Sequence, residues 1–280
     1  MTVPATAPVV LKIGGELLED AGRLASAAAG ISEAARRGAP LVVVHGGGRE
    51  IDAALEAAGI GRVQVDGLRV TDERTLDVVV SVLAGGVNTR LVAALAAAGV
   101  AAVGLTGADG GCGLVIPAPP HRAVDGRLVD LGRVGVPAPA SDMTLLRVLL
   151  AAGYVPVVAC IGADEAGRLY NVNADTLAAH LAGRLGAARL AIAGATPGVR
   201  DAAGATVPVV DAAGIESLIR GGTATAGMIA KLRACEDALA AGVPEVVVFD
   251  GRDGRMQPAL TGRHDGRGTR IMSAPAPALG

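Results

Sequence analysis

Lysine and aromatic residues are scarce in this chain of 280 residues. Only two of its 25 basic side chains are lysine, Lys12 and Lys231, and its aromatic residues are two tyrosines and one phenylalanine. A core without large rings has to be built from alanine, valine, leucine and isoleucine, which suits helices packed closely over strands of β-branched residues. Both lysines stand beside glycine-rich turns, where a compact ammonium fits a tight pocket that a planar guanidinium would overfill.

Cysteine is also rare, and neither sign of charge dominates. Cys112, Cys160 and Cys235 lie far apart, which excludes a Cys-x-x-Cys metal pair. Their odd number argues against a disulfide framework and for a reducing cytoplasm. The 25 basic and 27 acidic side chains are scattered and give a net charge of −2. This excludes the basic stripe of a nucleic-acid-binding protein, so no nucleic-acid partner is expected.

Long hydrophobic runs are few. Residues 1–8 lack a signal-peptide pattern, and residues 91–108 form a long stretch without charge. A membrane span needs about 20 residues, and Gly99 divides this stretch into an alanine-rich helix and a valine-containing strand. We therefore predict a buried helix–strand pair here and no membrane partner.

Apolar runs and helical patterns alternate along the chain. Strands are expected over residues 9–13, 41–45, 101–105, 155–161, 189–193 and 245–249. Helices are expected over residues 24–37, 50–58, 72–83, 88–98, 143–152, 174–185, 211–219 and 228–241. Several helices are followed by the glycine typical of a C-cap, namely Gly38, Gly59, Gly99, Gly153, Gly186 and Gly242. The alternation predicts an α/β fold: an open, mostly parallel central sheet sandwiched by helices in three αβα layers.

One stretch interrupts the alternation. Residues 112–139 are rich in proline and glycine, with short apolar pairs on either side of Asp125-Gly126, which predicts a β-hairpin insert. Such an insert forms either a lid over a site or a surface decoration, and both readings stay open. The tail, residues 273–280, has low complexity and is expected to be disordered.

Glycine turns follow three of the expected strands. They are Gly14-Gly15, Gly46-Gly47-Gly48 and the pair Gly104 and Gly107. In open parallel sheets, ligands bind outside the carboxyl ends of the strands. Glycines there expose backbone N–H groups, and a helix N-terminus adds about half a positive charge, so these turns predict an anion site. The sequence contains no P-loop motif, no dinucleotide fingerprint after the first strand and no Gly-x-Ser-x-Gly of a hydrolase.

Further polar residues gather near expected helix starts. Asn173 is well placed as the N-cap of a helix whose first turn contains Asp175. Asn171 precedes the cap, so helix capping gives no reason for an asparagine there. Lys231 lies near the start of another helix, where the macrodipole disfavours a cation unless an anion binds there too. Arg69, just ahead of a capped helix, is the arginine best placed to hold a carboxylate, whereas the others fit a solvated surface.

Five segments together resemble the amino acid kinase family. They are Lys12-Ile13-Gly14-Gly15, Val44-His45-Gly46-Gly47-Gly48, Gly67-Leu68-Arg69-Val70-Thr71, Tyr170-Asn171-Val172-Asn173-Ala174-Asp175 and Gly227-Met228-Ile229-Ala230-Lys231. Each alone is a weak signal, but the five occur in the family's order and spacing across nearly the whole chain. Within the family they are most similar to the members that phosphorylate N-acetyl-L-glutamate.

The resemblance implies two lobes on one sheet. Residues 1–186 would bind the acylated amino acid and form a homodimer, and residues 187–280 would bind ATP, with Mg²⁺ bridging its phosphates and no metal-binding residue of the protein. The implied catalytic residues are Lys12 and Lys231, which flank the transferred phosphoryl group, and Asp175, which orients both. The implied substrate-binding residues are Gly15, Gly47, Gly48, Arg69 and Asn171. The implied nucleotide-binding residues are Ala195, Thr196, Gly198, Arg200, Thr223 and Thr225.

The implied activity is phosphorylation of the side-chain carboxylate of N-acetyl-L-glutamate in arginine biosynthesis, by a cytoplasmic homodimer. The arginine-insensitive type is expected, because only about eight residues precede the first strand, too few for a stable extra helix. Two segments depart from the family. Gly194-Ala195 stands where relatives commonly have Thr/Ser-Asp, so a carboxylate near the nucleotide is missing, and Ala108 stands where many relatives have lysine.

Two alternatives stay open. The same motifs would serve a kinase for N-succinylglutamate or for carrier-linked aminoadipate, because Arg69 fits any α-carboxylate. An inactive nucleotide or amino-acid sensor of the same fold is favoured by Gly194-Ala195 and disfavoured by the intact Lys12, Asp175 and Lys231.

Overall fold

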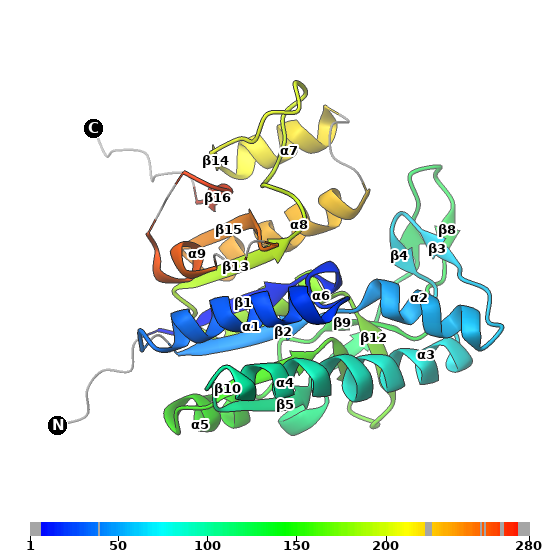
Figure 1. The fold of residues 1–280 in the computed structure, drawn as a ribbon. Coiled ribbons are helices and arrows are strands. Elements are labelled where there is room, and N and C mark those ends of the chain that lie inside the picture. Colours follow the sequence, from blue (N-terminus) through cyan, green and yellow to red (C-terminus); the bar gives the residue numbers. More distant parts are fainter. Residues whose placement is uncertain are drawn as a thin grey trace.

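An eight-stranded sheet forms the middle layer of the molecule (Figure 1). In spatial order its strands are β14 (Val209–Val210), β16 (Thr269–Met272), β15 (Glu245–Asp250), β13 (Arg189–Gly194), β1 (Val9–Ile13), β2 (Leu41–His45), β10 (Val155–Ala159) and β5 (Ala102–Thr106). Strands β15 through β5 are parallel, and β16 runs antiparallel to β15. The computed structural model describes residues 7–38, 40–221, 226–252, 254, 256–263 and 266–273. The expected open, mostly parallel sheet is confirmed.

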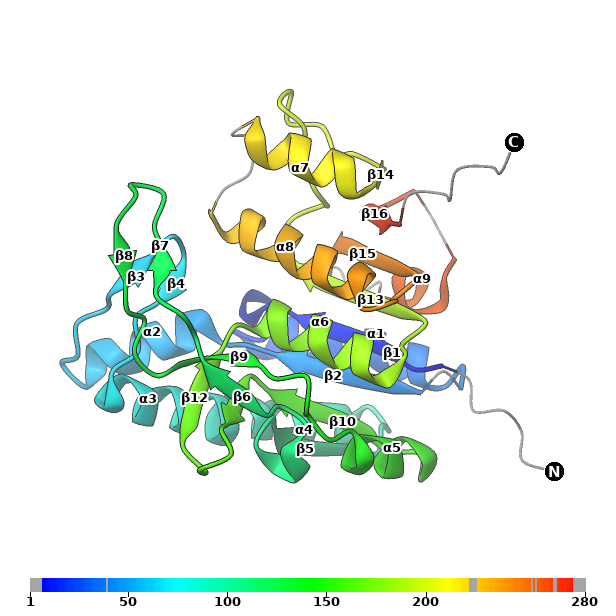
Figure 2. The same cartoon turned by 180° about the vertical axis from the view of Figure 1, so that it is seen from behind.

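Helices cover both faces of this sheet, as Figures 1 and 2 show from opposite sides. One face carries α1 (Ala21–Ala35), α4 (Asn88–Ala97) and α9 (Gln257–Thr261). The other face carries α5 (Thr144–Ala151), α6 (Ala174–Leu185), α7 (Ala212–Arg220) and α8 (Ala226–Ala240). Two more helices, α2 (Gly48–Ala57) and α3 (Glu73–Val80), extend beside the small hairpins in Figure 1. Because both faces of the sheet are covered, β1 and β2 are apolar runs rather than alternating strands.

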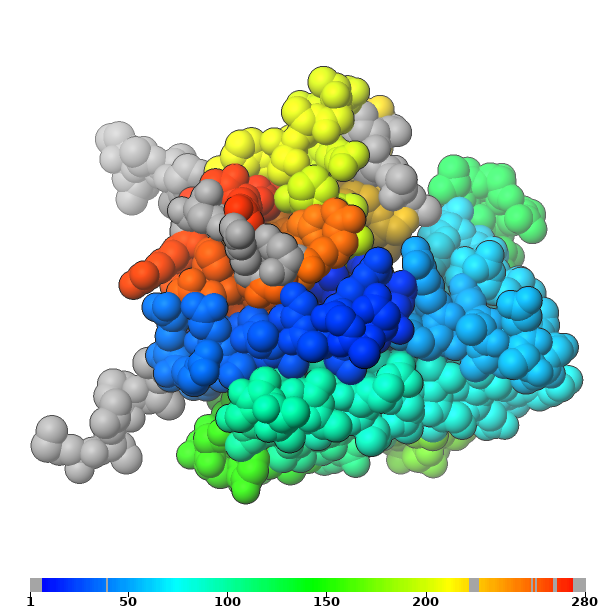
Figure 3. All heavy atoms as spheres, in the orientation of Figure 1, coloured from blue at the N-terminus to red at the C-terminus, as the bar shows by residue number. Residues whose placement is uncertain are grey.

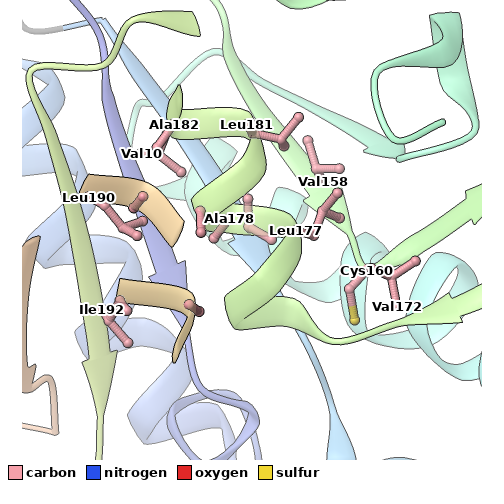
Figure 4. Packing of buried hydrophobic residues seen from close by; sticks show 14 of the residues in the cluster. Val10, Val158, Cys160, Val172, Leu177, Ala178, Leu181, Ala182, Leu190 and Ile192 are labelled. Atoms are coloured by element: carbon pink, nitrogen blue, oxygen red, sulfur yellow. The ribbon is translucent and has the colours of Figure 1, made fainter. Parts of the chain in front are cut away.

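Alternate residues of β1 belong to the two layers of the core. Val9, Leu11 and Ile13 pack with α1, α4 and α9, whereas Val10 packs with α6 and α8. Figure 4 shows this second layer, where small alanines of α6 let the helix lie close to the strands. Side chains of a strand point alternately to its two faces. Lys12 is two residues after Val10, so its side chain points to the same face as Val10, toward α6 and α8.

A smaller sheet and two hairpins adjoin the large sheet. The smaller sheet has the order β11 (Ile161–Ala163), β12 (Leu169–Val172), β9 (Val134–Pro137) and β6 (Val115–Pro117). One hairpin pairs β3 (Gln64–Val65) with β4 (Leu68–Arg69), and the other pairs β7 (His121–Arg122) with β8 (Leu128–Val129). The predicted hairpin around Asp125-Gly126 is therefore confirmed. The hairpins stand side by side in Figure 2, and His121 Nε2 lies 2.8 Å from Asp66 Oδ2 between them.

Most predicted elements lie within a few residues of their expected bounds. The six glycines predicted as C-caps all have positive φ, between 64° and 90°, a conformation that favours glycine. Two predictions of element bounds are wrong, and several short strands were not predicted. The helices 72–83 and 88–98 are joined through a π-helical segment, η2 (Ser81–Val87). The strand 155–161 breaks at Cys160 into β10 and β11, which belong to different sheets. Five short strands, β3, β4, β12, β14 and β16, had no predicted counterpart, because two to four residues carry little periodicity.

Residues 91–108 form a helix and a strand, as predicted, but their burial is incomplete. Leu91 and Leu95 are buried, whereas β5 is an edge strand whose residues are half-buried or exposed. Within the described ranges, one helical segment, Glu73–Ala97, is long and apolar enough to cross a membrane by length and composition alone. Its α4 part packs against α1 and contributes to the core, as a core helix of a globular protein does.

Candidate active site

The carboxyl ends of β1, β2 and β13 meet at one edge of the large sheet. The N–H of Gly14 donates to Ala193 O at 2.9 Å, so the turn after β1 lies against the end of β13. Gly15 faces the glycine turn after β2 closely: a Cβ on Gly15 would lie 3.0 Å from Gly47 Cα and 3.2 Å from Gly48 N. Strand β1 lies between β2 and β13, so the chain extends the sheet on opposite sides of β1. Open α/β sheets bind ligands at the carboxyl ends of the strands at such a point.

Lys12 and Lys231, far apart in the sequence, share the carboxylate of Asp175. Lys12 Nζ on β1 lies 3.0 Å from Asp175 Oδ1, and Lys231 Nζ on α8 lies 3.2 and 3.3 Å from the two oxygens. The three side chains are only 11% to 14% exposed. Asp175 stands in the first turn of α6, where Asn173 accepts from the N–H groups of Asp175 and Thr176. The fold thus brings the three predicted catalytic residues together.

The charges of these three side chains follow from burial and from one another. Burial raises the pKa of the Asp175 carboxyl, but the two ammonium groups outweigh it and lower that pKa to about 2. Burial lowers the pKa of Lys12, and Asp175 more than reverses this, so that the pKa lies above its ordinary value. The pKa of Lys231 is lowered by burial and by the charge of Lys12. Two cations around one anion leave a net positive charge, which can receive a further anion.

A cavity of about 200 Å³ opens beside the glycine turn after β2. Four of the five predicted substrate-binding residues line it: Gly47, Gly48, Arg69 and Asn171. The fifth, Gly15, lies next to Gly47 rather than in the lining. In Figure 3 the cyan and green hairpins stand apart from the gold and yellow C-terminal segments, with the blue N-terminal segment below the gap.

Arg69 is one of the residues that line this cavity. Its side chain is only 8% exposed, and its Nη2 donates to Asp52 Oδ1 and, at 3.4 Å, to Gly48 O. Its Nη1 is buried and has no hydrogen-bond partner among the described residues. A buried cationic donor without an acceptor is costly, so this corner favours the binding of an anionic group. Asn171 is fixed nearby, since its Nδ2 donates to Thr71 Oγ1 at 3.2 Å.

The predicted nucleotide-binding residues follow the end of β13. Ala195 is half-buried, Thr196 is exposed, and Arg200 is exposed where it forms an isolated bridge with Thr206. Gly198 has a φ of +151° and is packed so tightly that a Cβ would lie 2.6 Å from Thr269 Oγ1, so glycine is required there. Thr223 and Thr225 lie outside the described residues.

Glu16 is a charged neighbour that the sequence analysis missed. Its Oε1 accepts from the N–H of Ala195 at 3.0 Å, and its charge helps to raise the pKa of Lys12. The side chain folds back over Gly14, where a Cβ would lie 2.4 Å from Glu16 Oε2. Gly14 has a φ of −66°, which any residue can adopt, so a larger residue there would mainly displace the Glu16 carboxylate from this position. A carboxylate therefore does lie beside Ala195, supplied by the turn after β1.

Other residues of the cavity were not among the predicted substrate-binding residues, although Gly46 belongs to the turn predicted as an anion site. They are Gly46, Ile51, Gln64, Gly67, Leu68, Leu83, Val134, Cys160, Val172, Asn173 and Ala174. Composition predicts only that apolar residue types build the core, and no sequence signal distinguishes a core leucine from a pocket wall. Cys160 is a neutral wall residue, because burial raises the pKa of its thiol to about 12.

The sequence of this chain is similar to those of known proteins. A family model described as the amino acid kinase family matches residues 7–250. The chain is 43% identical over 265 residues to an acetylglutamate kinase of Methanopyrus kandleri, covering 94% of this chain and 99% of the relative. It is 42% identical over 267 residues to an acetylglutamate kinase of Solibacter usitatus, covering 95% and 99%.

Solved structures of other proteins have the same fold as this chain. An N-acetylglutamate synthase from Neisseria gonorrhoeae, complexed with coenzyme A and N-acetyl-glutamate, has a TM-score of 0.82 and 28% identity, covering 96% of this chain. This chain spans only 60% of the synthase chain. A carbamate kinase from Giardia lamblia bound to AMP-PNP has a TM-score of 0.69 at 17% identity, covering 97% and 100%, and shows the fold alone. The matching family model, the full-length relatives and the three-layer fold agree: this chain belongs to the amino acid kinase family.

Proposed function

We propose that this chain is an ATP-dependent kinase of arginine biosynthesis. It transfers the γ-phosphoryl group of ATP to the side-chain carboxylate of N-acetyl-L-glutamate and forms N-acetyl-L-glutamyl 5-phosphate. The observation that carries the proposal is the pair of buried lysines, Lys12 and Lys231, held on Asp175 at the edge where the glycine turns meet. The full-length likeness to acetylglutamate kinases supports the choice of acceptor.

The reaction needs alignment and cancellation of charge rather than a general base. The acceptor carboxylate is ionised at pH 7, so one of its oxygens attacks the γ-phosphorus. The bond from phosphorus to the β–γ bridging oxygen breaks, and ADP leaves with the electron pair. Lys12 and Lys231 offset the negative charge of the acceptor, the phosphoryl group and the leaving group. Asp175, which stays ionised, separates and orients the two ammonium groups, and the N–H groups of Gly15 and Gly47 face the transferred group.

The acylated amino acid is proposed to bind in the cavity beside β4. Arg69 is the clamp for the α-carboxylate, because its buried Nη1 lacks an acceptor among the described residues. Gly48 and Asn171 line the cavity and offer polar groups to the rest of the substrate. The cavity volume of about 200 Å³ limits the size of the acyl group that fits.

The nucleotide is proposed to bind to the lobe formed by residues 187–280, and the acylated amino acid to residues 1–186. The proposed contacts are Ala195, Thr196, Gly198, Arg200, Thr223 and Thr225. This division is supported by the sheet, in which β13 and β15 lie on one side of β1 and β2 on the other. Glu16 lies at the junction and ties the turn after β1 to Ala195.

Mg²⁺ is proposed to enter with the nucleotide. No group of three or more histidine, cysteine, aspartate or glutamate side chains that could hold a metal ion occurs among the residues described. Asp175 is already engaged by the two lysines. With few protein ligands on offer, the site fits a metal ion that is held mainly by phosphate oxygens and water, as is usual for Mg²⁺ with nucleotides. When bound, Mg²⁺ neutralises part of the phosphate charge.

An acceptor comparison tests the function. With ATP and Mg²⁺, release of ADP is expected to be fast with N-acetyl-L-glutamate and slow with N-succinylglutamate, carrier-linked aminoadipate or free glutamate. Hydroxylamine is expected to trap the acyl phosphate as a hydroxamate. Faster turnover of the succinyl or carrier-linked substrate would favour the first alternative. Binding of ATP without any ADP or hydroxamate would favour the inactive sensor.

We further propose that the protein acts in the cytoplasm as a homodimer joined through α4 and β5. Strand β5 is an uncharged edge strand, and such an edge exposes unpaired backbone groups unless another chain covers it. Ala93, Ala96 and Ala97 of the neighbouring α4 are exposed. A second copy on this surface would also cover the exposed residues of α4, which form the C-terminal part of the apolar segment Glu73–Ala97.

The dimer is tested by its mass in solution. Light scattering is expected to give about twice the chain mass of 27.5 kDa, and Ala93→Glu is expected to give monomers because it places charge at the centre of the face. Ala57→Glu, on the exposed part of α2, is the matched control and should leave the mass unchanged. A monomeric wild type, or a dimer that persists in Ala93→Glu, would contradict this interface.

A further inference from the structure

A fully buried histidine lies beneath the glycine turn after β2. His45 ends β2 and has 0% exposure. Its Nδ1 lies 3.0 Å from Gly46 O, and its Nε2 lies 3.0 Å from Nδ2 of the buried Asn88. Gly104 on β5 makes room for this pair, because a Cβ there would lie 2.2 Å from Asn88 Oδ1. The mechanism described above uses neither His45 nor Asn88.

Carbonyl groups around Asn88 decide which nitrogen of His45 carries the proton. Asn88 Nδ2 also lies 2.9 Å from Val157 O and 3.3 Å from Leu105 O, and a carbonyl oxygen can only accept. The amide nitrogen must therefore face this cluster, where it donates to His45 Nε2. The proton of the ring is then on Nδ1, which donates to Gly46 O. Burial lowers the pKa of His45 to about 4, so the ring is neutral at pH 7.

This hydrogen bond determines the direction of the peptide between Gly46 and Gly47. The described chain contains no cis peptide bond, and in a trans peptide the C=O and the N–H point in opposite directions. Because Gly46 O is turned inward to the buried ring, the N–H of Gly47 is turned outward, on the side where Gly15 lies. A Cβ on Gly15 would be 3.4 Å from Gly47 N. No described residue accepts a hydrogen bond from this N–H.

We propose that His45 is a positioning residue for phosphoryl transfer. Held in its Nδ1–H tautomer by Asn88, it fixes the Gly46–Gly47 peptide so that the Gly47 N–H points at the transferred group. A peptide between two glycines has wide conformational freedom, and a donor stabilises a transition state best when its direction is fixed beforehand. The inference rests on the proposed kinase function. It adds that His45 orients one of the hydrogen-bond donors to the transferred group, the N–H of Gly47.

Two substitutions separate the roles of the two ring nitrogens. His45→Asn keeps an amide donor near the position of Nδ1 and loses the contact with Asn88. His45→Gln keeps a polar group near the position of Nε2 and loses the donor to Gly46 O. We expect kcat to fall about 10²-fold in His45→Gln and only a few-fold in His45→Asn, with the KM values of both substrates nearly unchanged.

The order of stabilities distinguishes positioning from packing. Asparagine is smaller than glutamine and leaves the larger hole, so His45→Asn is expected to melt at the lower temperature although it keeps more activity. The matched controls are His180→Asn and His180→Gln, because half-buried His180 contacts Ser141 Oγ at 2.9 Å instead of a glycine turn. Their kcat values should stay near that of the wild type. Equal kcat in the two position-45 variants, or a loss that follows melting temperature, would overturn the role of His45.

Measurements on the unmodified protein complete the test. If the wild type forms no hydroxamate, the kinase function itself fails; an active wild type with indistinguishable position-45 variants refutes only the positioning role. In protein labelled with ¹⁵N-histidine, the ring shifts of His45 are expected to report a neutral Nδ1–H tautomer from pH 8 down to pH 5. The Nε2–H tautomer, or protonation within that range, would contradict the inference even if no variant folds.

Discussion

Lys12→Arg is expected to lower kcat by about 10²- to 10³-fold, while the KM of each substrate changes far less. The Lys12 side chain is 11% exposed and its Nζ lies 3.0 Å from Asp175 Oδ1, in a site closed by the glycine turns. A guanidinium keeps the charge but is wider than an ammonium and cannot occupy the same point. The substitution therefore removes an interaction made with the transferring group rather than one made equally with bound substrate. Steady-state kinetics with both substrates varied measures this effect.

An arginine-to-lysine substitution on the exposed surface of α8 is the control for Lys12→Arg. Arg233→Lys, two residues from Lys231 on α8, changes a side chain that is 49% exposed and paired with Glu216 and Glu236. It should leave kcat and both KM values near those of the wild type, since surface ion pairs contribute little. A near-normal kcat in folded Lys12→Arg would refute the proposed catalytic role of Lys12. Circular dichroism and melting temperature establish whether the variant is folded.

The ionisation of Asp175 gives a second check on the same group. Because two lysines hold its pKa at about 2, below the ordinary value of 3.8, Asp175 stays charged at every pH where the protein is assayed. Its contribution to stability is present above pH 3.8 and is lost as pH falls toward 2. The pH profile of kcat between pH 5 and 9 therefore has no inflection from this carboxylate.

Arg69→Lys is expected to raise the KM for N-acetyl-L-glutamate by about 10- to 100-fold, with the KM for ATP unchanged. Arg69 uses Nη2 for Asp52 and has Nη1 left to bind a carboxylate. A single ammonium cannot serve both partners in that forked geometry. Losing charge-assisted hydrogen bonds to the substrate costs roughly 1.5–3 kcal/mol, which corresponds to the stated range. The comparison of the two KM values measures whether the loss is confined to the acceptor.

Arg62→Lys is the matched control, because Arg62 pairs with the same Asp52 from a position where its side chain is 58% exposed. It should change the KM for N-acetyl-L-glutamate by less than about twofold. If Arg69→Lys weakened ATP and N-acetyl-L-glutamate equally, Arg69 would have a general structural role. If it weakened neither, the α-carboxylate would have to bind elsewhere.

Local features of the fold could be predicted because they depend on near neighbours in the chain. The apolar runs of β1 and β2 match the observed strands residue for residue. Asn173 caps α6 as predicted, since an N-cap needs only the N–H groups of the next turn. Where the local signal is weak, prediction failed: η2 continues α3 into α4 through Gly85 and Gly86, although glycine usually disfavours a helix.

Long-range partners could not be predicted in the same way. The Glu16 contact with Ala195, the Asp52 contact with Arg69 and the Asn88 contact with His45 each join segments that are distant in the chain. A carboxylate or an amide in a helical pattern is most often solvated, so nothing in its own surroundings identified it as a partner. The edge strand β5 illustrates the same limit, because its composition predicted burial and its position in the sheet left it half-exposed.

The amino-acid sequence by itself determined the order of strands and helices, the glycine turns at strand ends and the two places where lysine is kept. These follow from residue periodicity and from backbone preferences that act over a few residues. Only the tertiary structure decided that both ammonium groups meet on one carboxylate, that Arg69 keeps a buried donor without an acceptor among the described residues and that a histidine lies under the glycine turn. The reason is physical: burial and pairing depend on which elements pack together, and that choice is made by the whole chain.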